Sequence, residues 1–367
     1  MLSNDYPAQL KITLRQYRQF VYRQGRLFLL SLFLIATLAA CLAAPENSSQ
    51  PLVSPRPTQP TDETESLVAQ IATLPEVKAS QPWQIVFASK SPVGDDGKII
   101  DPNWENIWQA IQAAAIDFGV TVTLVDSPCQ TCAHEQIQTI NDLLARSPQI
   151  NGLLIGVNDS WALAPVVDKV IGEGIPTIAI DTPLNSNLLL TTIGFDNFAG
   201  GQRMGEWVVE KLHGQGQVAI LNGPLDQQNA IDRQHGFLRG LQQGQDIKIL
   251  AVEEANWHQN NAQKITAKWL KQYPELDAII AANDYMALGA SDAAATAQIP
   301  LLITGFDATD FALDAIQKGQ FAATISQKFS QQGRLALQLL VRHLENQETL
   351  PPLIPLTNTQ IITQADL

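Results

Sequence analysis

The chain is poor in positive charge and in cysteine. Its 367 residues include 23 Lys and Arg against 36 Asp and Glu. Five of the basic residues but only one acidic residue lie in the first 40 positions, so residues 41–367 carry a net charge of −17. Nucleic-acid binding requires a basic surface, so this composition argues against a nucleic-acid partner. The three cysteines leave no second ligand pair for a structural zinc site.

Long hydrophobic runs are also scarce. The uncharged run Leu27–Ala40 has 14 residues, fewer than the roughly 20 that span a bilayer. It follows a basic segment, a combination typical of a signal peptide. Its end, Leu38-Ala39-Ala40-Cys41, resembles a bacterial lipobox, in which Cys41 takes the lipid. We expect residues 1–40 to be a lipoprotein signal peptide; the alternative is an uncleaved anchor. Either reading places the chain in the periplasm or at the outer face of the cytoplasmic membrane.

Residues 41–82 are rich in Pro, Ser, Thr, Gln and Glu, and we interpret them as a flexible tether because few large apolar side chains offset the ordering entropy. From Trp83 onward, strand-like runs alternate with helical stretches, which is the pattern of parallel βαβ units. These units exceed a single comfortable core, so two lobes are expected. The predicted strands are Gln84–Ala88, Val120–Val125, Gly152–Ile155, Thr177–Ile180, Val218–Leu221, Lys248–Val252, Ala278–Ala281, Leu301–Thr304 and Ala323–Ile325.

Two apolar strands end in short polar side chains. Residues 281–290 (AANDYMALGA) and residues 303–307 (ITGFD) place Asn283 and Asp307 at carboxyl ends of strands, where open α/β sheets bind ligands. The alternative is a helix-capping Asn and a turn Asp. Both segments resemble the type I periplasmic sugar-binding proteins, the ribose and galactose receptors of import systems, in which the Asn and the Asp touch the sugar.

The resemblance covers nearly all of the chain beyond Trp83 and implies a fold. It predicts an α/β clamshell of two Rossmann-like lobes with parallel sheets, joined by a three-segment hinge near Phe195, Gln327 and Pro355. The N-terminal lobe would comprise residues 83–195 plus 328–355, and the C-terminal lobe residues 196–327 plus 356–367. Repressors of the lactose-repressor type share this fold but carry a DNA-binding headpiece, whereas here an export signal takes that place.

Further segments match the family residue by residue. Asp101-Pro102-Asn103-Trp104 resembles an Asn-Pro-Phe-Phe element, which implies that Asp101 binds hydroxyls and Trp104 stacks on the ring; Asn103 stands where the family often has an aromatic residue. A helix-start turn with a core Trp is the alternative. Ser89, at the end of the first strand, matches a polar position of the family.

Three matches concern hydrogen-bonding groups that the family directs at the sugar. Asp181 matches a sugar-binding Asp, but the Arg that follows it in ribose receptors is Thr182 here. A second sugar-binding Arg aligns with Ile231, while Arg233 matches a more structural Arg. A hydroxyl and an alkyl chain cannot replace two guanidinium groups, which argues against ribose itself; Asn229 substitutes in part.

The remaining matches supply an aromatic face and a hinge amide. Trp257 lies where ribose receptors carry a Phe that covers the sugar, although a core Trp is equally compatible with the sequence. Gln327 matches a hinge Gln that bonds to sugar. The ligand-binding residues that we predict are Ser89, Asp101, Asn103, Trp104, Asp181, Asn229, Trp257, Asn283, Asp307 and Gln327.

Cys129 and Cys132 are separated by two residues, and a local disulfide is the default interpretation in an exported protein; free thiols or a metal site are the alternatives. We expect no metal, no cofactor and no catalytic set. The sequence therefore predicts a monomeric, lipid-anchored solute-binding protein that delivers a small neutral ligand, a sugar above all, to the permease of an ABC importer. The alternatives are a receptor for a sensor kinase or chemoreceptor, and an enzyme that uses Asp181 and Asp307 on carbohydrates.

Overall fold

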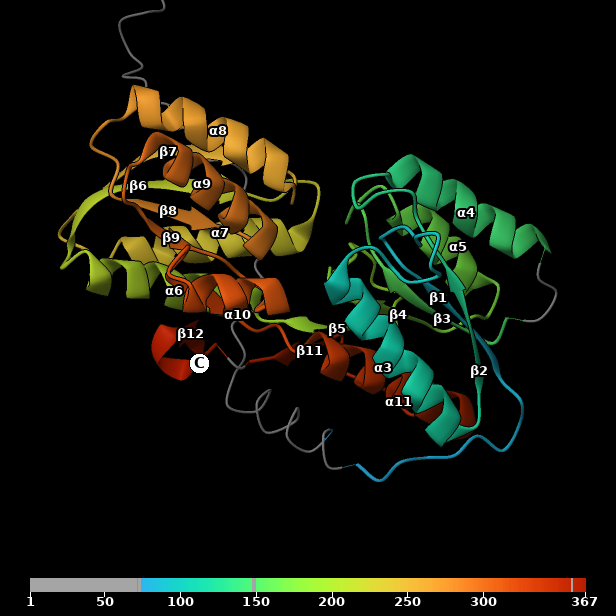
Figure 1. Cartoon of the computed structure of the whole chain (residues 1–367). Helices are drawn as coiled ribbons and strands as arrows, with labels where there is room; N and C mark the ends of the chain where they lie inside the picture. The colour runs from blue at the N-terminus through green and yellow to red at the C-terminus, as the bar shows by residue number, and fades with distance from the viewer. Residues whose placement is uncertain (1–70, 72–73, 147–149, 358) are drawn as a thin grey trace, which may run out of the picture. The chain divides into compact units, whose positions relative to one another are not determined.

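A computed structural model describes residues 71, 74–146, 150–357 and 359–367. The predicted signal peptide, Cys41 and most of the predicted tether lie outside these residues. The described chain forms two six-stranded sheets (Figure 1). The first has the order β11-β5-β4-β3-β1-β2 and is parallel throughout. Its strands are β1 Gln84–Ala88, β2 Thr121–Val125, β3 Gly152–Gly156, β4 Thr177–Ile180, β5 Thr191–Phe195 and β11 Leu353–Leu356.

The second sheet has the order β12-β10-β9-β8-β6-β7 and is parallel except for the antiparallel pair of β10 and β12. Its strands are β6 Gln215–Asn222, β7 Asp246–Glu254, β8 Ala278–Ala281, β9 Leu302–Thr304, β10 Ala323–Ile325 and β12 Ile361–Thr363. The chain passes between the sheets after β5, after β10 and after β11. The predicted clamshell of two lobes joined by a three-segment hinge is thereby confirmed.

Helices cover both faces of each sheet. Four of the described helices form the first lobe together with the first sheet: α3 Pro102–Phe118, α4 Ala133–Arg146, α5 Ala164–Gly172 and α11 Phe329–Asn346. Five other described helices form the second lobe together with the second sheet: α6 Asn197–Lys211, α7 Gln228–Leu241, α8 Gln259–Gln272, α9 Asp284–Ala297 and α10 Asp310–Gln317. A short 3-10 helix, Gln364–Asp366, ends the chain. In Figure 1, α3 lies beside α11 and α8 beside α9, as their packing also indicates.

The first lobe has a core on each face of its sheet because successive strand residues point in opposite directions. Ile85 and Phe87 of β1 pack with α3 and α11, whereas Val86 and Ala88 pack with α4 and α5. A strand buried on both faces reads as a continuous apolar run, which is why the β1 sequence was recognisable.

Four predicted strands have the observed bounds, and the others differ by one or a few residues at their ends. The strands that sequence reasoning missed are β5, β11 and β12. β5 contains two Thr and a Gly, and β11 contains Pro355. β11 lies at the edge of its sheet, where a proline costs no ladder hydrogen bond on the outer side.

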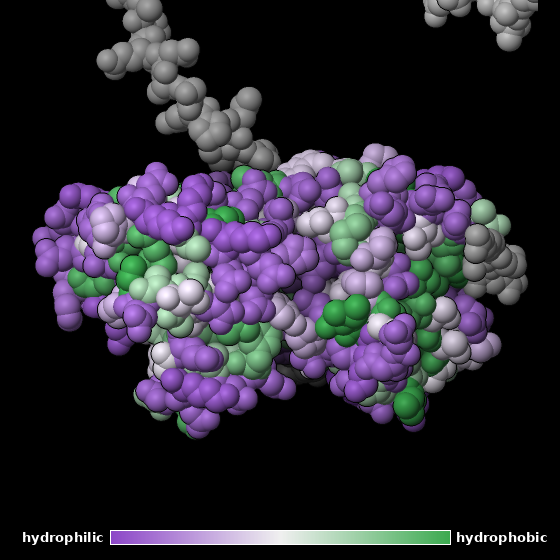
Figure 2. Space-filling model, turned by 45° about the horizontal axis from the view of Figure 1, so that its top comes forward, coloured by the Kyte–Doolittle hydropathy of each residue, from purple (hydrophilic) through white to green (hydrophobic). Residues whose placement is uncertain are grey.

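The face in Figure 2 is mostly hydrophilic, and its hydrophobic side chains form small, scattered patches. Within the part of the chain that the structure describes, none of the helices combines the length and the apolar character that crossing a membrane requires.

Helices α6 and α7 approach closely because glycines face each other along their contact. A Cβ atom on Gly236 would lie 2.3 Å from the carbonyl oxygen of Phe198, and one on Gly240 would lie 2.2 Å from that of Gln202. These neighbours are backbone atoms, so they cannot rotate away as a side chain could.

We therefore predict that Gly236→Ala lowers the free energy of unfolding by about 2 kcal/mol or more through overpacking. The matched control is Gly172→Ala, since Gly172 is exposed near the end of α5 and an added Cβ meets no atom within 4 Å. The control should be neutral or stabilising by up to about 1 kcal/mol. Urea titrations of the two variants would contradict the close-packing argument if both lost the same stability.

Candidate functional site

Polar side chains from both lobes gather at the carboxyl ends of the strands. Asp181 follows β4 of the first lobe, and Asn283, Asp307 and Gln327 follow β8, β9 and β10 of the second. All four are buried. A buried polar group is costly unless it is hydrogen-bonded, so their partners define the site.

Asp307 forms one direct link between the lobes. Its Oδ2 accepts a hydrogen bond of 2.9 Å from Asn103 Nδ2 of the first lobe, and its Oδ1 accepts one from Gln327 Nε2. The Arg233 guanidinium lies 3.8 Å from Oδ1. Burial raises the pKa of Asp307 well above its ordinary value, and Arg233 opposes that shift. Gln327 Oε1 has no hydrogen-bond partner among the described residues, so this buried acceptor is able to take a donor from a ligand.

Asp181 forms a second link between the lobes. Its Oδ2 accepts hydrogen bonds from Thr182 Oγ1 at 2.8 Å and from Asn229 Nδ2 of the second lobe at 3.1 Å. Its backbone φ is 67°, and φ is 125° at Asp307 and 64° at Trp257. A positive φ is rare for a residue other than glycine and costs about 1–3 kcal/mol of conformational energy for each residue. Such backbone strain clusters at functional sites.

Lys90 is a site residue that sequence reasoning missed. It follows Ser89 at the end of β1, is 2% exposed, and places Nζ 3.6 Å from Asp181 Oδ2. The ammonium group donates to Thr182 Oγ1 at 2.8 Å and to Gln227 Oε1 of the second lobe at 3.1 Å. Burial lowers the pKa of Lys90, and Asp181 opposes the shift. A buried positive charge from the end of β1 therefore lies beside Asp181.

Two tryptophans lie at the site, one from each lobe. Trp104 and Trp257 are both buried, and each covers a glycine at a strand end. A Cβ on Gly156 would lie 2.4 Å from the Trp104 ring, and one on Gly223 would lie 2.2 Å from the Trp257 ring. Trp257 Nε1 donates to Gln227 Oε1 at 3.0 Å. Both rings therefore have packing roles, and whether they also cover a ligand stays a prediction.

Asp101 caps helix α3. Its Oδ1 accepts from the backbone N–H groups of Asn103 at 2.9 Å and Trp104 at 3.3 Å, while Oδ2 accepts from Gln130 Nε2 at 2.7 Å. Burial raises the pKa of Asp101, and the Gln130 hydrogen bond opposes the shift. Asp101 is therefore oriented by both the helix start and the loop after β2.

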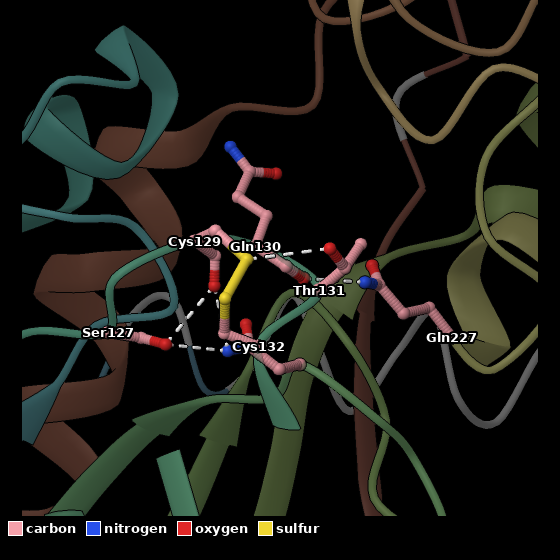
Figure 3. The surroundings of a disulfide bond; sticks show 7 residues. Ser127, Cys129, Gln130, Thr131, Cys132 and Gln227 are labelled. Atoms are coloured by element: carbon pink, nitrogen blue, oxygen red, sulfur yellow. Dashed lines mark hydrogen bonds between the residues drawn. A yellow bond between two sulfur atoms is a disulfide. The ribbon is translucent and has the colours of Figure 1, made fainter. Parts of the chain in front are cut away.

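Gln130 belongs to a loop that we call the disulfide loop, residues 127–132. Cys129 and Cys132 are joined by a disulfide, with their Cα atoms 5.2 Å apart (Figure 3). The main-chain oxygen of Gln130 accepts a 2.9 Å hydrogen bond from Gln227 Nε2. Gln130 and Gln227 are further residues that sequence reasoning missed, and no local pattern marked them, because each acquires its role through a partner far away in the chain.

The other predicted residues have more local partners. Asn283 Oδ1 caps α9 by accepting from Met286 N, and its Nδ2 donates to the Trp257 main-chain oxygen at 3.4 Å. This is the capping role that the sequence also allowed. The Ser89 hydroxyl exchanges hydrogen bonds with the backbone of Ser91.

Arg233 is a buried residue that contacts Asp307 and is itself held by several hydrogen bonds. Nε and Nη2 donate to Asn197 Oδ1 at 2.9 and 2.6 Å, Nη1 donates to the Ala282 main-chain oxygen, and the guanidinium lies 4.0 Å from the Phe306 ring centre. These contacts fit the structural role that the resemblance assigned to it.

Comparison with known proteins places this arrangement in context. Residues 98–348 match the profile of the periplasmic binding protein domain. The chain is 30% identical over 228 residues to the ribose import binding protein of Haemophilus influenzae, which covers 62% of this chain and 76% of that protein.

Two solved structures share the fold. A myo-inositol binding protein from Caulobacter aligns with a TM-score of 0.70 and 25% identity, over 79% of this chain and 96% of its own. The fructose-binding periplasmic domain of a hybrid two-component system aligns with a TM-score of 0.70 and 24% identity, over 77% and 91%.

Asp284 makes the stability of this region depend on pH. Burial raises its pKa to about 6, although Thr309 and Thr324 donate hydrogen bonds to it. The unfolded chain releases this proton near pH 3.9. Between about pH 4 and 6 the folded state binds the extra proton, so the free energy of unfolding falls as pH rises through this window.

In the wild type, we expect the free energy of unfolding to fall by about 2–3 kcal/mol between about pH 4 and 6, and we predict that Asp284→Asn removes this fall. Urea titrations at pH 4, 5, 6 and 7 measure it, and Asp310→Asn, an exposed change on α10, is the control. Parallel stability curves for the wild type and Asp284→Asn would contradict the shifted pKa.

Proposed function

Because the chain belongs to the periplasmic binding protein family, we propose that it captures a small neutral sugar between its lobes and delivers it to an ABC importer. The observation that carries the proposal is the set of buried polar groups, from both lobes, that converge on Asp181 and Asp307. Sugar hydroxyls both donate and accept hydrogen bonds, so carboxylate, amide and ammonium groups are suitable partners.

The charges of the site favour a neutral ligand. Its two buried cations, Lys90 and Arg233, each lie within 4 Å of a carboxylate, at 3.6 Å from Asp181 and 3.8 Å from Asp307. An anionic ligand would therefore meet cations that are already paired. Desolvating its charge beside two carboxylates would cost more than it gains.

Ligand capture proceeds by lobe closure. We propose that residues 83–195 with 328–355 close against residues 196–327 with 356–367. The hydrogen bonds of Asn103 to Asp307 and of Asn229 to Asp181 join the lobes directly. A ligand that replaces them with its own hydroxyls contacts both lobes, and because it does so only in the closed form, it stabilises that form.

The family is extracytoplasmic, and its members are substrate-binding proteins rather than enzymes, which confirms that part of the sequence prediction.

We further propose that Cys41 carries a lipid and that the protein acts as a monomer at the membrane surface beside its permease. A sensory role is the second candidate, supported by the likeness to the periplasmic domain of a two-component system.

We predict that D-fructose, myo-inositol or another neutral sugar or polyol stabilises the protein in a thermal-shift screen. Ligand at 100 times its Kd raises the free energy of unfolding by about 2.7 kcal/mol, which raises the Tm by a few degrees. Asp181→Asn should weaken the binding of that sugar roughly 10- to 100-fold, because charge-assisted hydrogen bonds are lost.

The matched control is Asp95→Asn, in an exposed turn, which should bind as the wild type does. A wild-type protein that binds amino acids or nucleosides but no sugar would overturn the sugar assignment. Unchanged affinity in Asp181→Asn would remove the proposed site, and turnover of the bound sugar would contradict a binding role.

The proposed anchor has its own test. We predict that the full chain, expressed in a bacterium with metabolically labelled fatty acid, incorporates the label and partitions with membranes. Cys41→Ser should lose the label, because only the thiol accepts the lipid, while Cys129→Ser should keep it. Labelling that survives in Cys41→Ser would show that the lipobox interpretation is wrong.

A further inference from the structure

The disulfide loop lies at the site, although neither its cysteines nor Gln130 belong to the residues predicted to bind ligand. Cys129 and Cys132 are half-buried, so a small reductant can reach them. The loop joins β2 to α4 at the carboxyl end of the first sheet, where the candidate ligand residues also lie.

The base of the loop is fixed to the first lobe. Asn158 Nδ2 donates to Ser127 Oγ at 2.8 Å and to the Cys129 main-chain oxygen at 3.0 Å, and Ser127 Oγ donates to that same oxygen at 3.1 Å. Ser127 and Asn158 are buried. With its base held and its two ends cross-linked, the short segment between the cysteines has little conformational freedom.

Gln130, within that segment, faces two ways. Its side chain donates to Asp101 Oδ2 at 2.7 Å in the first lobe, and its main-chain oxygen accepts from Gln227 Nε2 at 2.9 Å in the second. Figure 3 shows Gln227 reaching the loop. Gln227 Oε1 in turn accepts from Lys90 and Trp257. A continuous set of hydrogen bonds therefore runs from Asp101 through Gln130 to Gln227 and on to Lys90 and Trp257.

We infer that Gln130 is a positioning residue for ligand binding, and that the Cys129–Cys132 disulfide holds it where it orients Asp101 and links the closed lobes. The inference rests on the proposed function of the same site. It adds a redox dependence: the oxidised protein retains its sugar longer than the reduced one. An ordered loop lowers the entropy cost of closure, because the hydrogen bond to Gln227 needs no further restriction of the chain.

Reduction is a thiol–disulfide exchange. A dithiol such as dithiothreitol gives up two electrons and two protons and becomes a cyclic disulfide, while the Cys129–Cys132 bond breaks and yields two thiols. The freed loop then orders Gln130 less well, so the bonds to Asp101 and Gln227 form only part of the time.

The test uses the full chain with Cys41→Ser, in which Cys129 and Cys132 are the only cysteines. The probe is the sugar from the screen above that binds most tightly. Its dissociation constant and off-rate are measured for the oxidised and the dithiothreitol-reduced protein, with and without Gln130→Ala. Gln138→Ala, an exposed Gln on α4, is the matched control, and melting temperatures show that each form is folded.

We expect Gln130→Ala to weaken binding of the sugar about 10-fold, mainly through a faster off-rate. Reduction should cause a similar loss of affinity in the parent and in Gln138→Ala, but a smaller further loss in Gln130→Ala, because the substitution has already removed the side-chain bond to Asp101 and only the main-chain bond to Gln227 remains to be weakened. This non-additivity separates positioning from a purely structural role.

Unchanged affinity on reduction would overturn the inference, and so would equal losses in the parent and in Gln130→Ala, since the disulfide would then act through fold stability alone. In either case the proposed function stands, because the oxidised chain still binds sugar. If no sugar binds the oxidised chain, the proposed function fails and the inference falls with it.

Discussion

The organisation of the site follows from the cost of burying charge. Two carboxylates, Asp181 and Asp307, lie buried at the ends of strands in different lobes, and each lies beside a buried cation. An unpaired buried charge would cost several kcal/mol, so these groups require partners wherever they lie. Two of the partners, Asn103 and Asn229, come from the opposite lobe. Under the proposed function, a ligand that offers hydroxyls to these groups competes with the hydrogen bonds that now join the lobes.

The fold supplies this arrangement by simple means. Parallel strands bring their carboxyl ends to one edge of each sheet, which collects polar residues from separate βα units. Close packing then sets their positions. Glycines let α6 and α7 approach until backbone meets backbone, and Gly156 and Gly223 accept the two tryptophan rings. Asp181, Trp257 and Asp307 adopt backbone conformations that L-residues rarely use, and the packed surroundings maintain that strain.

The disulfide loop and Lys90 bring to the site groups that the resemblance to sugar receptors did not predict. The sequence resemblance matches Thr182 to an Arg of the ribose receptors, and in the structure the Lys90 ammonium donates to the Thr182 hydroxyl. An ammonium is a compact donor without the planar fork of a guanidinium, so it orients hydroxyls differently. Gln130 donates a hydrogen bond to Asp101 from a loop that the Cys129–Cys132 disulfide closes. The ligand preference of this chain is therefore expected to differ from that of a ribose receptor.

The sequence by itself determined the α/β class, the lobes and most strands, because strands buried on both faces read as apolar runs that end in polar residues. It also placed Asp181, Asn283 and Asp307 at strand ends. Only the tertiary structure identified β5, β11 and β12, together with Lys90, Gln130 and Gln227. A short strand that contains Thr, Gly or Pro depends on its neighbours for pairing. A buried lysine or glutamine depends on partners distant in sequence, and no local pattern records which residues those are.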